Sequence, residues 1–361
     1  MQILRKIKIM KQKLLFFLMN GVGGAERITI TISNLFDRKN FEIKYVIVQE
    51  GDDKVCQFIN PEAPIIKMPR KRIYLSTWPI YRLLKQERPN IVFCASPAIN
   101  ARLIIAAKMV GGIRVVVRNS NMFNFERRDV QWLMKKTYRY ADKIILQQDE
   151  MREDIHRRIS GLPREKTITL HNPIDLTHIN EGIKAPNPYP KEEAINYLWV
   201  ARFAHEKAQD ILVKAFSIVK KSKPTAHLWL VGRYNDNSEM VVSIKEFINE
   251  NNLRESVHFV GYDNNPYKWM KHCDCFVLPS RKEGLPNVLI EAMFLGIPVV
   301  STKCLEIISE MVDDGVNGYT CSVESPEELA NAMVKTLSLK DCKMIYKPAS
   351  KEEFIKAITV G

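Results

Sequence analysis

The 361-residue sequence lacks the marks of several protein classes. No run of 18 apolar residues occurs, and the apolar stretch at 14–19 is too short for a secretory signal, so we expect neither a membrane span nor a leader. The seven cysteines are odd in number and scattered, which is typical of a reduced, cytoplasmic protein and not of a disulfide framework. No D-x-D motif and no carboxylate cluster with divalent-metal spacing is present, so we expect no metal site.

The composition is that of a soluble globular protein, with 46% hydrophobic and 26% charged residues. Positive charge is concentrated in the first half of the chain. Residues 1–180 hold 32 Lys and Arg against 17 Asp and Glu, whereas the remainder holds 22 against 24. This asymmetry indicates an anionic partner for the first half, such as a membrane surface, a phosphate-bearing acceptor or nucleic acid. A solvated basic face with no partner is the alternative.

Strands and helices are predicted to alternate along most of the chain. Continuous apolar runs of strand length recur between helical segments, which is typical of parallel sheets covered by helices on both faces. A stretch at 174–194 has three prolines in five residues and no periodicity, which predicts a linker. We therefore divide the chain into an N-terminal domain at 1–173, this linker, a C-terminal domain at 195–349, and a segment at 350–361 that is expected to cross back to the first domain.

The most informative stretch is 279–301, PSRKEGLPNVLIEAMFLGIPVVS. It follows an apolar strand and is predicted to turn at EGLPN, with Pro286 at the first helical position and Gly296 as a left-handed cap after the helix. A strand–turn–helix junction directs free backbone N–H groups and the positive end of a helix out of the turn, which suits phosphate.

Two acids in this stretch, Glu283 and Glu291, would repel a phosphate, so we expect them to accept hydrogen bonds from sugar and ribose hydroxyls. The stretch resembles the signature of the retaining family 4 glycosyltransferases of the GT-B fold, in which two glutamates are separated by seven residues. Two surface acids on an ordinary helix are the alternative interpretation. The resemblance implies an α/β protein with two Rossmann-like domains facing across a cleft.

A second match lies at 200–216, VARFAHEKAQDILVKAF, which resembles the strand, loop and helix that carry the family's donor-phosphate cations. By that match Arg202 and Lys207 bind the diphosphate and stabilise the leaving group. Ala201 and Ala208 stand where the family often has glycine, which changes how closely the backbone approaches the phosphates.

The N-terminal glycine loop, NGVGGAE at 20–26, resembles the loop after the family's first strand. It does not fit the dinucleotide G-x-G-x-x-G spacing, because Glu26 occupies the last glycine position. Taken together, the resemblance implies Glu283, Arg202 and Lys207 as catalytic residues. It implies a donor site made of Gly23, Gly24, Arg202, Lys207, Gly232, Glu283, Gly284, Leu285, Pro286, Asn287 and Glu291.

The acceptor side departs from the family pattern. Many relatives carry a histidine after the fifth strand, where this chain has VVVRNSN with Arg118 and Asn119. These two are our acceptor-side candidates, and a core-edge ion pair is the alternative for Arg118. The loop at 303–306 is also shorter than the family's glycine-proline loop.

The resemblance implies a hexosyltransferase-type enzyme that needs no metal or other cofactor. It would move a sugar from a nucleotide-sugar, a UDP-sugar above all, to a glycan or polyprenyl-diphosphate-linked acceptor in bacterial polysaccharide or lipopolysaccharide assembly. We expect a cytoplasmic protein, peripheral on the inner face of the membrane, that binds anionic lipid through its N-terminal domain at 69–74 and 127–143, and no nucleic acid.

Two other functions stay open. Sugar-nucleotide 2-epimerases share the fold and hydrolyse or epimerise the donor without an acceptor. A non-catalytic basic binding module is the third hypothesis, and a pI near 9.3 suggests nucleic acid as its ligand. Product analysis with and without acceptor separates the first two, and salt-dependent RNA binding without nucleotide-sugar binding would favour the third.

Overall fold

The computed structural model describes residues 11–21, 23–48, 54–68, 76–123, 126–190, 194–340 and 342–360. The chain divides into two compact units. The first unit comprises Met1–Pro173 and Pro348–Gly361, and the second unit comprises Ile174–Lys347.

The first unit is built on a seven-stranded sheet in the order β3-β2-β1-β4-β5-β6-β7, and every neighbouring pair is parallel. Its strands are apolar because helices cover both faces of the sheet. The strands are β1 Gln12–Leu18, β2 Phe41–Ile47, β3 Ile65–Lys67, β4 Ile91–Cys94, β5 Arg114–Asn119, β6 Lys143–Leu146 and β7 Thr167–Thr169. The helices and turns between them are α1 Gly24–Asn34, η1 Lys54–Phe58, α2 Thr77–Glu87, α3 Pro97–Val110, α4 Arg128–Thr137, η4 Tyr138–Tyr140, α5 Asp149–Arg158 and η5 Arg164–Lys166.

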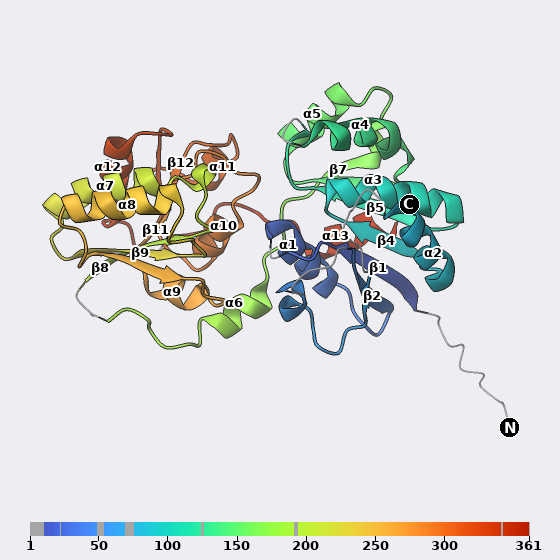
Figure 1. Ribbon diagram of the computed structural model, residues 1–361, viewed down its shortest axis with the longest axis horizontal. Helices are drawn as coiled ribbons and strands as arrows, with labels where there is room; N and C mark the ends of the chain where they lie inside the picture. Colours follow the sequence, from blue (N-terminus) through green and yellow to red (C-terminus); the bar gives the residue numbers. More distant parts are fainter. Residues whose placement is uncertain are drawn as a thin grey trace. The chain divides into compact units, whose positions relative to one another are not determined.

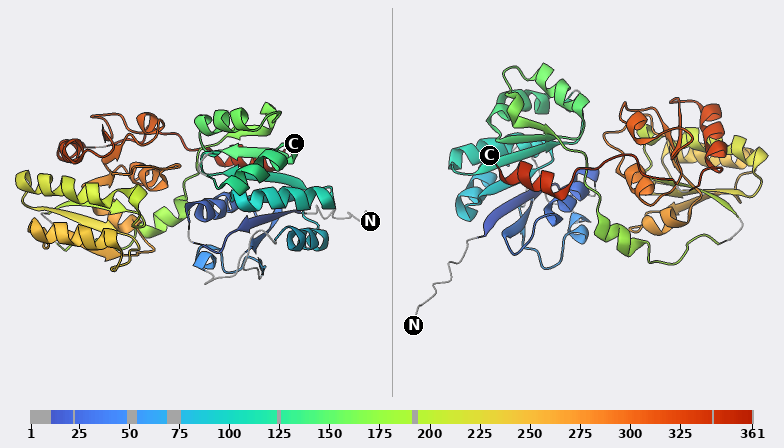
Figure 2. Two further views of the ribbon diagram at one scale, coloured as in Figure 1. Left: turned by 45° about the horizontal axis from the view of Figure 1, so that its top comes forward. Right: turned by 180° about the vertical axis from the view of Figure 1, so that it is seen from behind.

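Alternate residues of β1 enter two separate cores, as the pleat of a strand requires. Leu15 and Phe17 pack with residues of α2, α3, α4 and α5, whereas Leu14 and Phe16 pack with residues of α1 and of the last helix, α13 (Lys351–Thr359). The last helix therefore belongs to the first unit although it follows the second in sequence, and the rear view of Figure 2 shows it (red) along the strands.

Helix α13 is held to the first unit by its core side and by its carbonyl groups. Phe354 and Ile358 are fully buried, and the Arg114 guanidinium donates to the carbonyl oxygens of Ile358 (2.8 Å) and Ala357 (3.2 Å). A capping box at Ser350 and Glu353 fixes the start of the helix.

The second unit has a six-stranded parallel sheet in the order β10-β9-β8-β11-β12-β13. β8 lies beside β11, although β9 and β10 lie between them in sequence, because the connection from β10 to β11 crosses back past β9 and β8. Its elements, labelled in Figure 1, are α6 Leu176–Gly182, β8 Ile195–Val200, η6 His205–Lys207, α7 Gln209–Ser222, β9 Ala226–Val231, α8 Glu239–Glu250, β10 Val257–Gly261, α9 Tyr267–His272, β11 Cys275–Leu278, α10 Asn287–Phe294, β12 Val299–Thr302, α11 Ile308–Met311, β13 Gly318–Cys321 and α12 Pro326–Thr336.

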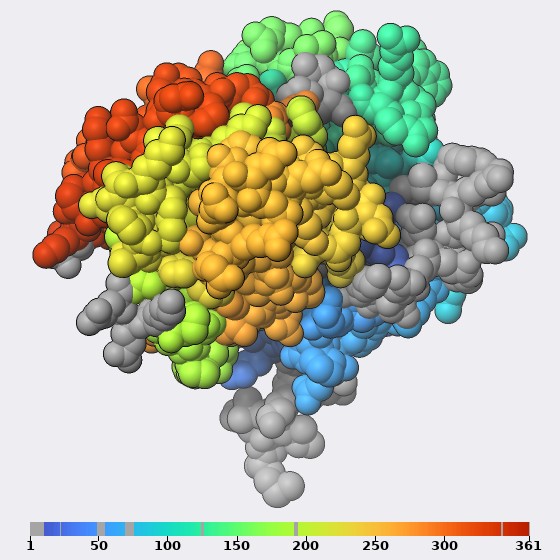
Figure 3. Space-filling view, turned by 60° about the vertical axis from the view of Figure 1, so that its left-hand side comes forward, coloured from blue at the N-terminus to red at the C-terminus, as the bar shows by residue number. Residues whose placement is uncertain are grey.

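Helices cover both faces of this sheet as well. Residues of α7, α8 and α12 form one core with the strands, and residues of α9, α10 and α11 form the other. Figure 3 shows α7 (yellow-green), α8 (orange) and α12 (red) next to one another on the surface of the second unit.

The stretch treated as a linker, 174–194, differs from that expectation where the structure describes it. It lies in the second unit and contains α6, whose first turn is capped by the Asp175 side chain accepting from the His178 N–H. Tyr189 is buried and donates from its hydroxyl to the carbonyl oxygen of Trp269 at 2.8 Å. The three prolines conceal this anchoring, because they interrupt the periodicity by which a helix or a buried segment is recognised.

Candidate active site

The predicted site residues of the second unit follow the carboxyl ends of neighbouring strands. Arg202 and Lys207 follow β8, Gly232 follows β9, and Glu283 follows β11. The carboxyl ends of parallel strands lie at one edge of the sheet, where ligands of open α/β sheets bind. The loop after β11 and the helix α10 add the remaining predicted residues of this unit: Gly284, Leu285, Pro286, Asn287 and Glu291.

Lys207 and Glu283 form a close, largely buried ion pair at this edge. The Lys207 ammonium donates to both oxygens of Glu283, at 2.6 and 2.7 Å. The side chain of Lys207 is 19% exposed and that of Glu283 only 8%. A carboxylate this deeply buried needs partners for its oxygens, and the ammonium supplies charge compensation as well. The pair thus places one cation and one acceptor-rich anion at the same point.

One hydroxyl that the sequence analysis did not single out, that of Ser280, holds the Glu283 carboxylate, and a second, that of Thr302, holds the Ser280 backbone. Ser280 Oγ donates to Glu283 Oε1 at 2.7 Å, and Thr302 Oγ1 donates to the carbonyl oxygen of Ser280 at 2.5 Å. Ser280 and Thr302 are buried at the ends of adjacent strands β11 and β12. Serine and threonine at strand ends are too common to predict such a role from one sequence.

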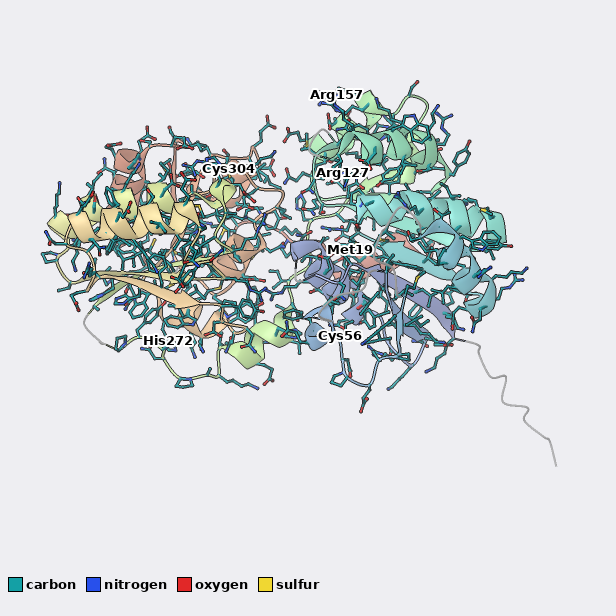
Figure 4. The ribbon with its side chains drawn as sticks, in the orientation of Figure 1. Met19, Cys56, Arg127, Arg157, His272 and Cys304 are labelled. Carbon is teal, nitrogen blue, oxygen red and sulfur yellow. The ribbon has the colours of Figure 1, made fainter. Side chains whose placement is uncertain are left out.

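A thiol lies beside this cluster. Cys304 follows β12 and is labelled in Figure 4. Burial raises the pKa of Cys304 to about 11; the negative charge of Glu283 adds to this effect, and the Thr302 side chain and the Lys207 charge oppose it. Cys304 is therefore a neutral thiol at pH 7, and its pKa responds to the charges of Lys207 and Glu283.

Arg202 extends from the same loop into solvent, with 71% of its side chain exposed. Its guanidinium is paired with the carboxylate of Glu206, four residues further on. Gln209 at the start of α7 donates to the carbonyl oxygen of Arg202 at 3.2 Å, which fixes the backbone. An exposed ion pair of this kind contributes little to stability, so Arg202 can exchange Glu206 for another anion at small cost.

Ala208 is one of the departures from the family pattern, and its backbone conformation shows what the departure costs. It adopts a left-handed conformation, with φ 53° and ψ 41°, at the start of α7. A residue with a Cβ pays about 1 kcal/mol for this conformation, whereas glycine does not. The left-handed backbone conformation at this position thus explains why the family often has glycine there. Ala208 adopts the same conformation at the cost of strain, so the turn is kept.

Glu291 lies in α10, where the hydroxyl of Tyr267 donates to Glu291 Oε1 at 3.3 Å. The helix begins at Asn287, with Pro286 one position earlier than predicted, as its N-cap. Gly296 has φ 74°, the left-handed conformation that its predicted role after the helix requires. Within the EGLPN turn, the Leu285 side chain is buried and packs into the core.

In the first unit, Gly23 and Gly24 lie at the start of α1, with Gly23 as the N-cap in an extended conformation. A Cβ on Gly23 would lie 2.6 Å from Glu26 Oε2, so the glycine makes room for that carboxylate. Burial raises the pKa of Glu26, while hydrogen bonds from the backbone around Gly23 and Met19 act in the opposite direction. The glycine loop therefore carries a partly buried acid that the sequence analysis treated only as a mismatch to a dinucleotide motif.

Arg118 and Asn119, at the end of β5, are both buried in the first unit. The Arg118 guanidinium donates to Asn172 Oδ1, so a neutral amide is one of its partners. The Tyr138 hydroxyl donates to Asn119 Oδ1 at 2.8 Å, and burial raises the pKa of that tyrosine. The structure therefore places the acceptor-side candidates in an internal hydrogen-bond network.

Among the described residues, no three His, Cys, Asp or Glu side chains gather in a way that would bind a metal ion. Within that same part of the chain, every helix is too short or too polar to cross a bilayer.

Comparison with family models identifies both units. The model described as Glycosyltransferase Family 4 matches residues 22–178, and that described as Glycosyl transferases group 1 matches residues 183–353. The matches thus extend over most of the first unit and nearly all of the second.

Curated relatives extend over nearly the whole chain. An N-acetylgalactosamine-N,N'-diacetylbacillosaminyl-diphospho-undecaprenol 4-alpha-N-acetylgalactosaminyltransferase of Campylobacter jejuni is 28% identical over 361 residues, which cover 94% of either protein. An uncharacterized glycosyltransferase of Haemophilus influenzae is 27% identical, covering 91% of this chain and 90% of its own. The UDP-Gal:alpha-D-GlcNAc-diphosphoundecaprenol alpha-1,3-galactosyltransferase of Escherichia coli is 24% identical, and the match covers 91% of this chain and 89% of the relative.

Solved structures share the fold at lower identity. HepE of Anabaena, in complex with UDP and glucose, superposes with a TM-score of 0.70 at 20% identity, covering 91% of this chain and 92% of its own. WaaG, a glycosyltransferase involved in lipopolysaccharide biosynthesis, gives 0.67 at 17% identity, covering 96% and 100%. With two parallel-sheet α/β units and family matches over both, the chain belongs to the family 4-type glycosyltransferases of the GT-B fold.

Proposed function

We propose that this glycosyltransferase moves a hexose-type sugar from a UDP-sugar to a lipid-linked glycan, with retention of configuration and without a metal ion. The observation that carries the proposal is the Lys207–Glu283 pair at the strand ends of the second unit, with the exposed Arg202 beside it in sequence. A cation next to a buried carboxylate matches a ligand that has a diphosphate joined to a polyhydroxyl sugar.

Each residue then has a distinct role. Lys207 and Arg202 bind the diphosphate, one as a point charge and the other as a planar fork. The Glu283 carboxylate accepts hydrogen bonds from hydroxyls of the transferred sugar. Backbone N–H groups in Gly284–Asn287 donate hydrogen bonds to oxygens of the same sugar. Glu291 accepts from the ribose hydroxyls.

In the reaction, the bond between the sugar C1 and the phosphate oxygen breaks, and its electrons go to that oxygen. The acceptor hydroxyl forms the new bond to C1 on the same face, and its proton passes to the departing phosphate oxygen. The cations stabilise the charge that develops on the diphosphate. This route requires no strong protein base, which accords with the sequence VVVRNSN at the place where many relatives have a histidine.

The names of two relatives support the substrate classes. The Campylobacter protein is named for a diphospho-undecaprenol acceptor, and the Escherichia protein for a UDP-Gal donor and a diphosphoundecaprenol acceptor. A polyprenyl-diphosphate acceptor is held in a membrane, so the enzyme must work at a lipid surface.

A basic face of the first unit suits that surface. Helix α4 and the turn η4 expose Trp132 by 60% and Tyr140 by 54%. The same stretch exposes Arg128, Lys135, Lys136 and Arg139 at helical spacing, and Arg127 (labelled in Figure 4) precedes it. Aromatic rings favour the lipid headgroup region, and each basic side chain near an anionic surface adds about 1 kcal/mol. We infer that this face docks on the inner side of the cytoplasmic membrane. The other predicted basic stretch, 69–74, lies outside the described residues.

The test is a panel of UDP-, GDP- and ADP-sugars incubated with liposomes that contain a polyprenyl-diphosphate sugar. We expect one UDP-sugar to label the lipid and free UDP to appear in equal amount. UDP release or an altered sugar without any acceptor would favour the epimerase alternative. Absence of nucleotide-sugar binding, together with salt-dependent RNA binding, would favour the basic binding module.

Cys304 provides a chemical reporter for the donor site. Because its thiol pKa is raised to about 11, alkylation by iodoacetamide should be slow at pH 7 and about tenfold faster for each pH unit up to 10. A UDP-sugar bound at Lys207 and Glu283 should slow this labelling at least about fivefold by covering the thiol.

The experiment is done in a Cys56→Ser background, since Cys56 and Cys304 are the two partly exposed thiols among seven cysteines and the other five are buried. Labelled protein is quantified by mass spectrometry. A labelling rate that is independent of saturating UDP-sugar, in a protein shown to bind it, would place the donor elsewhere.

A further inference from the structure

Arg281 has every donor of its guanidinium occupied. Nη1 donates to Asp210 Oδ1 (2.9 Å) and to the carbonyl oxygen of His205 (2.7 Å). Nη2 donates to Asp210 Oδ2 (2.7 Å) and Glu324 Oε2 (3.1 Å), and Nε donates to Glu324 Oε1. An arginine has five N–H donors, and here each has an acceptor in a different place.

These contacts join three loops at the carboxyl edge of the second unit. His205 lies in η6 after β8, Asp210 lies in the first turn of α7, and Glu324 lies between β13 and α12. The backbone N–H of Arg281 also donates to the carbonyl oxygen of Glu206 at 2.9 Å. Glu324 has a left-handed φ of 61°, a conformation that needs support from its surroundings.

The Lys207–Glu283 pair lies inside this set of contacts. Lys207 comes between the clamped His205 and Asp210, and Glu283 is two residues after Arg281. A shift of the η6 loop relative to the β11–α10 loop would separate the Lys207 ammonium from the Glu283 oxygens, which now lie at 2.6 and 2.7 Å. The contacts of Arg281 oppose that shift from both sides.

The electrostatics agree with a firm attachment. The Arg281 side chain is only 14% exposed. Burial by itself would raise the pKa of Asp210, but the hydrogen bonds from Arg281 and its charge outweigh this effect and lower that pKa. Lysine has three donors on one atom and cannot reach two carboxylates and a carbonyl in this planar arrangement.

We propose that Arg281 is a positioning residue for sugar transfer. It touches no substrate, and it holds the η6 loop against the β11–α10 loop. The Lys207 ammonium and the Glu283 carboxylate are thereby kept at the relative positions in which they bind the donor. This inference rests on the proposed function, since it assigns Lys207 to the diphosphate and Glu283 to the transferred sugar. Small displacements of groups that bind a reacting centre cost rate far more than they cost stability.

The test compares wild type, Arg281→Lys and, as a matched control, Arg254→Lys, an exposed arginine of the same unit. For Arg281→Lys we expect kcat/KM to fall about 30-fold, mostly in kcat, and the Kd of UDP to rise about 10-fold. The Kd of uridine, which carries no diphosphate, should stay within about twofold of wild type. Amide hydrogen exchange should speed up in the three clamped segments, residues 203–210, 280–286 and 322–325, and nowhere else in the second unit.

Unchanged kcat, UDP affinity and loop exchange in Arg281→Lys would overturn the proposal. Equal losses of uridine and UDP affinity would also overturn it, because a merely structural arginine affects the whole pocket alike. If Arg281→Lys does not fold, Glu324→Gln removes the charge of one of the two carboxylates that Arg281 binds. An unaltered kcat and unaltered amide hydrogen exchange in that variant would contradict the proposal. If the wild type binds no UDP, the proposed function fails, and the exchange experiment alone decides whether Arg281 holds the two loops.

Discussion

Replacing Lys207 by methionine is expected to lower kcat/KM for sugar transfer about 10³-fold, the effect of removing one preorganised charge from a developing anion. Methionine keeps the length of the side chain and removes its charge. The change also leaves the Glu283 carboxylate, 8% exposed, without the ammonium that now contacts both of its oxygens. A buried charge that loses its partner costs about 3 kcal/mol, so the unfolding midpoint should fall as well.

A double variant separates the two effects. In Lys207→Met/Glu283→Gln both charges are gone, and Ser280 still has an oxygen to which it can donate, so the free energy of unfolding should return to within about 1 kcal/mol of wild type. Activity should stay lost. Lys214→Met, an exposed lysine on α7, is the control and should change neither quantity. Initial rates and urea titrations measure both, and a Lys207→Met enzyme with nearly normal kcat/KM would remove Lys207 from the site.

Replacing Gly232 by alanine should lower the free energy of unfolding by about 3 kcal/mol or more. A Cβ at this position would lie 1.6 Å from the carbonyl oxygen of Ala201, a backbone atom that cannot rotate away. The ends of β8 and β9 would have to separate. That movement would break the bond from the Ala201 N–H to the Val231 carbonyl oxygen (3.1 Å) and strain the bond from the Gly232 N–H to the Gly261 carbonyl oxygen (2.8 Å), which joins β9 to β10.

The expected loss tests whether Gly232 serves strand spacing, as its neighbours indicate, or only the approach of a ligand. Gly21→Ala is the control, because nothing lies within 4 Å of the Cβ it would add, and its effect should stay within about 1 kcal/mol. Because Gly21 lies in the first unit, far-ultraviolet circular dichroism measures the unfolding of both variants. Tryptophan fluorescence follows the second unit in addition, since its three tryptophans are buried: Trp199, Trp229 and Trp269. Normal stability combined with lost UDP binding in Gly232→Ala would show that the ligand, and not the sheet, requires the glycine.

Much of the fold is predictable because each strand is a continuous apolar run between helical segments. Helix α10 is an example: it begins at Asn287, one residue after the predicted first helical position, Pro286. The fold class, two parallel α/β units of the GT-B type, follows from that alternation and from the match at 279–301, and the comparisons confirm it.

What could not be predicted depends on contacts between distant residues or on segments with a weak pattern. Helix α5, DEMREDIHRR, has a weak helical pattern, because Met151 and Ile155 are its only apolar core residues. The contact between Lys207 and Glu283 joins residues 76 apart and requires β8 to pair with β11, a strand order that no local pattern encodes. The five contacts of Arg281 depend on the same order.

The return of α13 to the first unit has a consequence for the order in which the chain can fold as it is made. The first unit lacks Phe354 and Ile358 of its core until residues 351–359 have left the ribosome, and by then all of Ile174–Lys347 has been synthesised. Domains ordinarily mature from the N-terminus onward during translation. Here the second unit, contiguous in sequence, is free to complete its core while the first still exposes the groove that its last helix will fill.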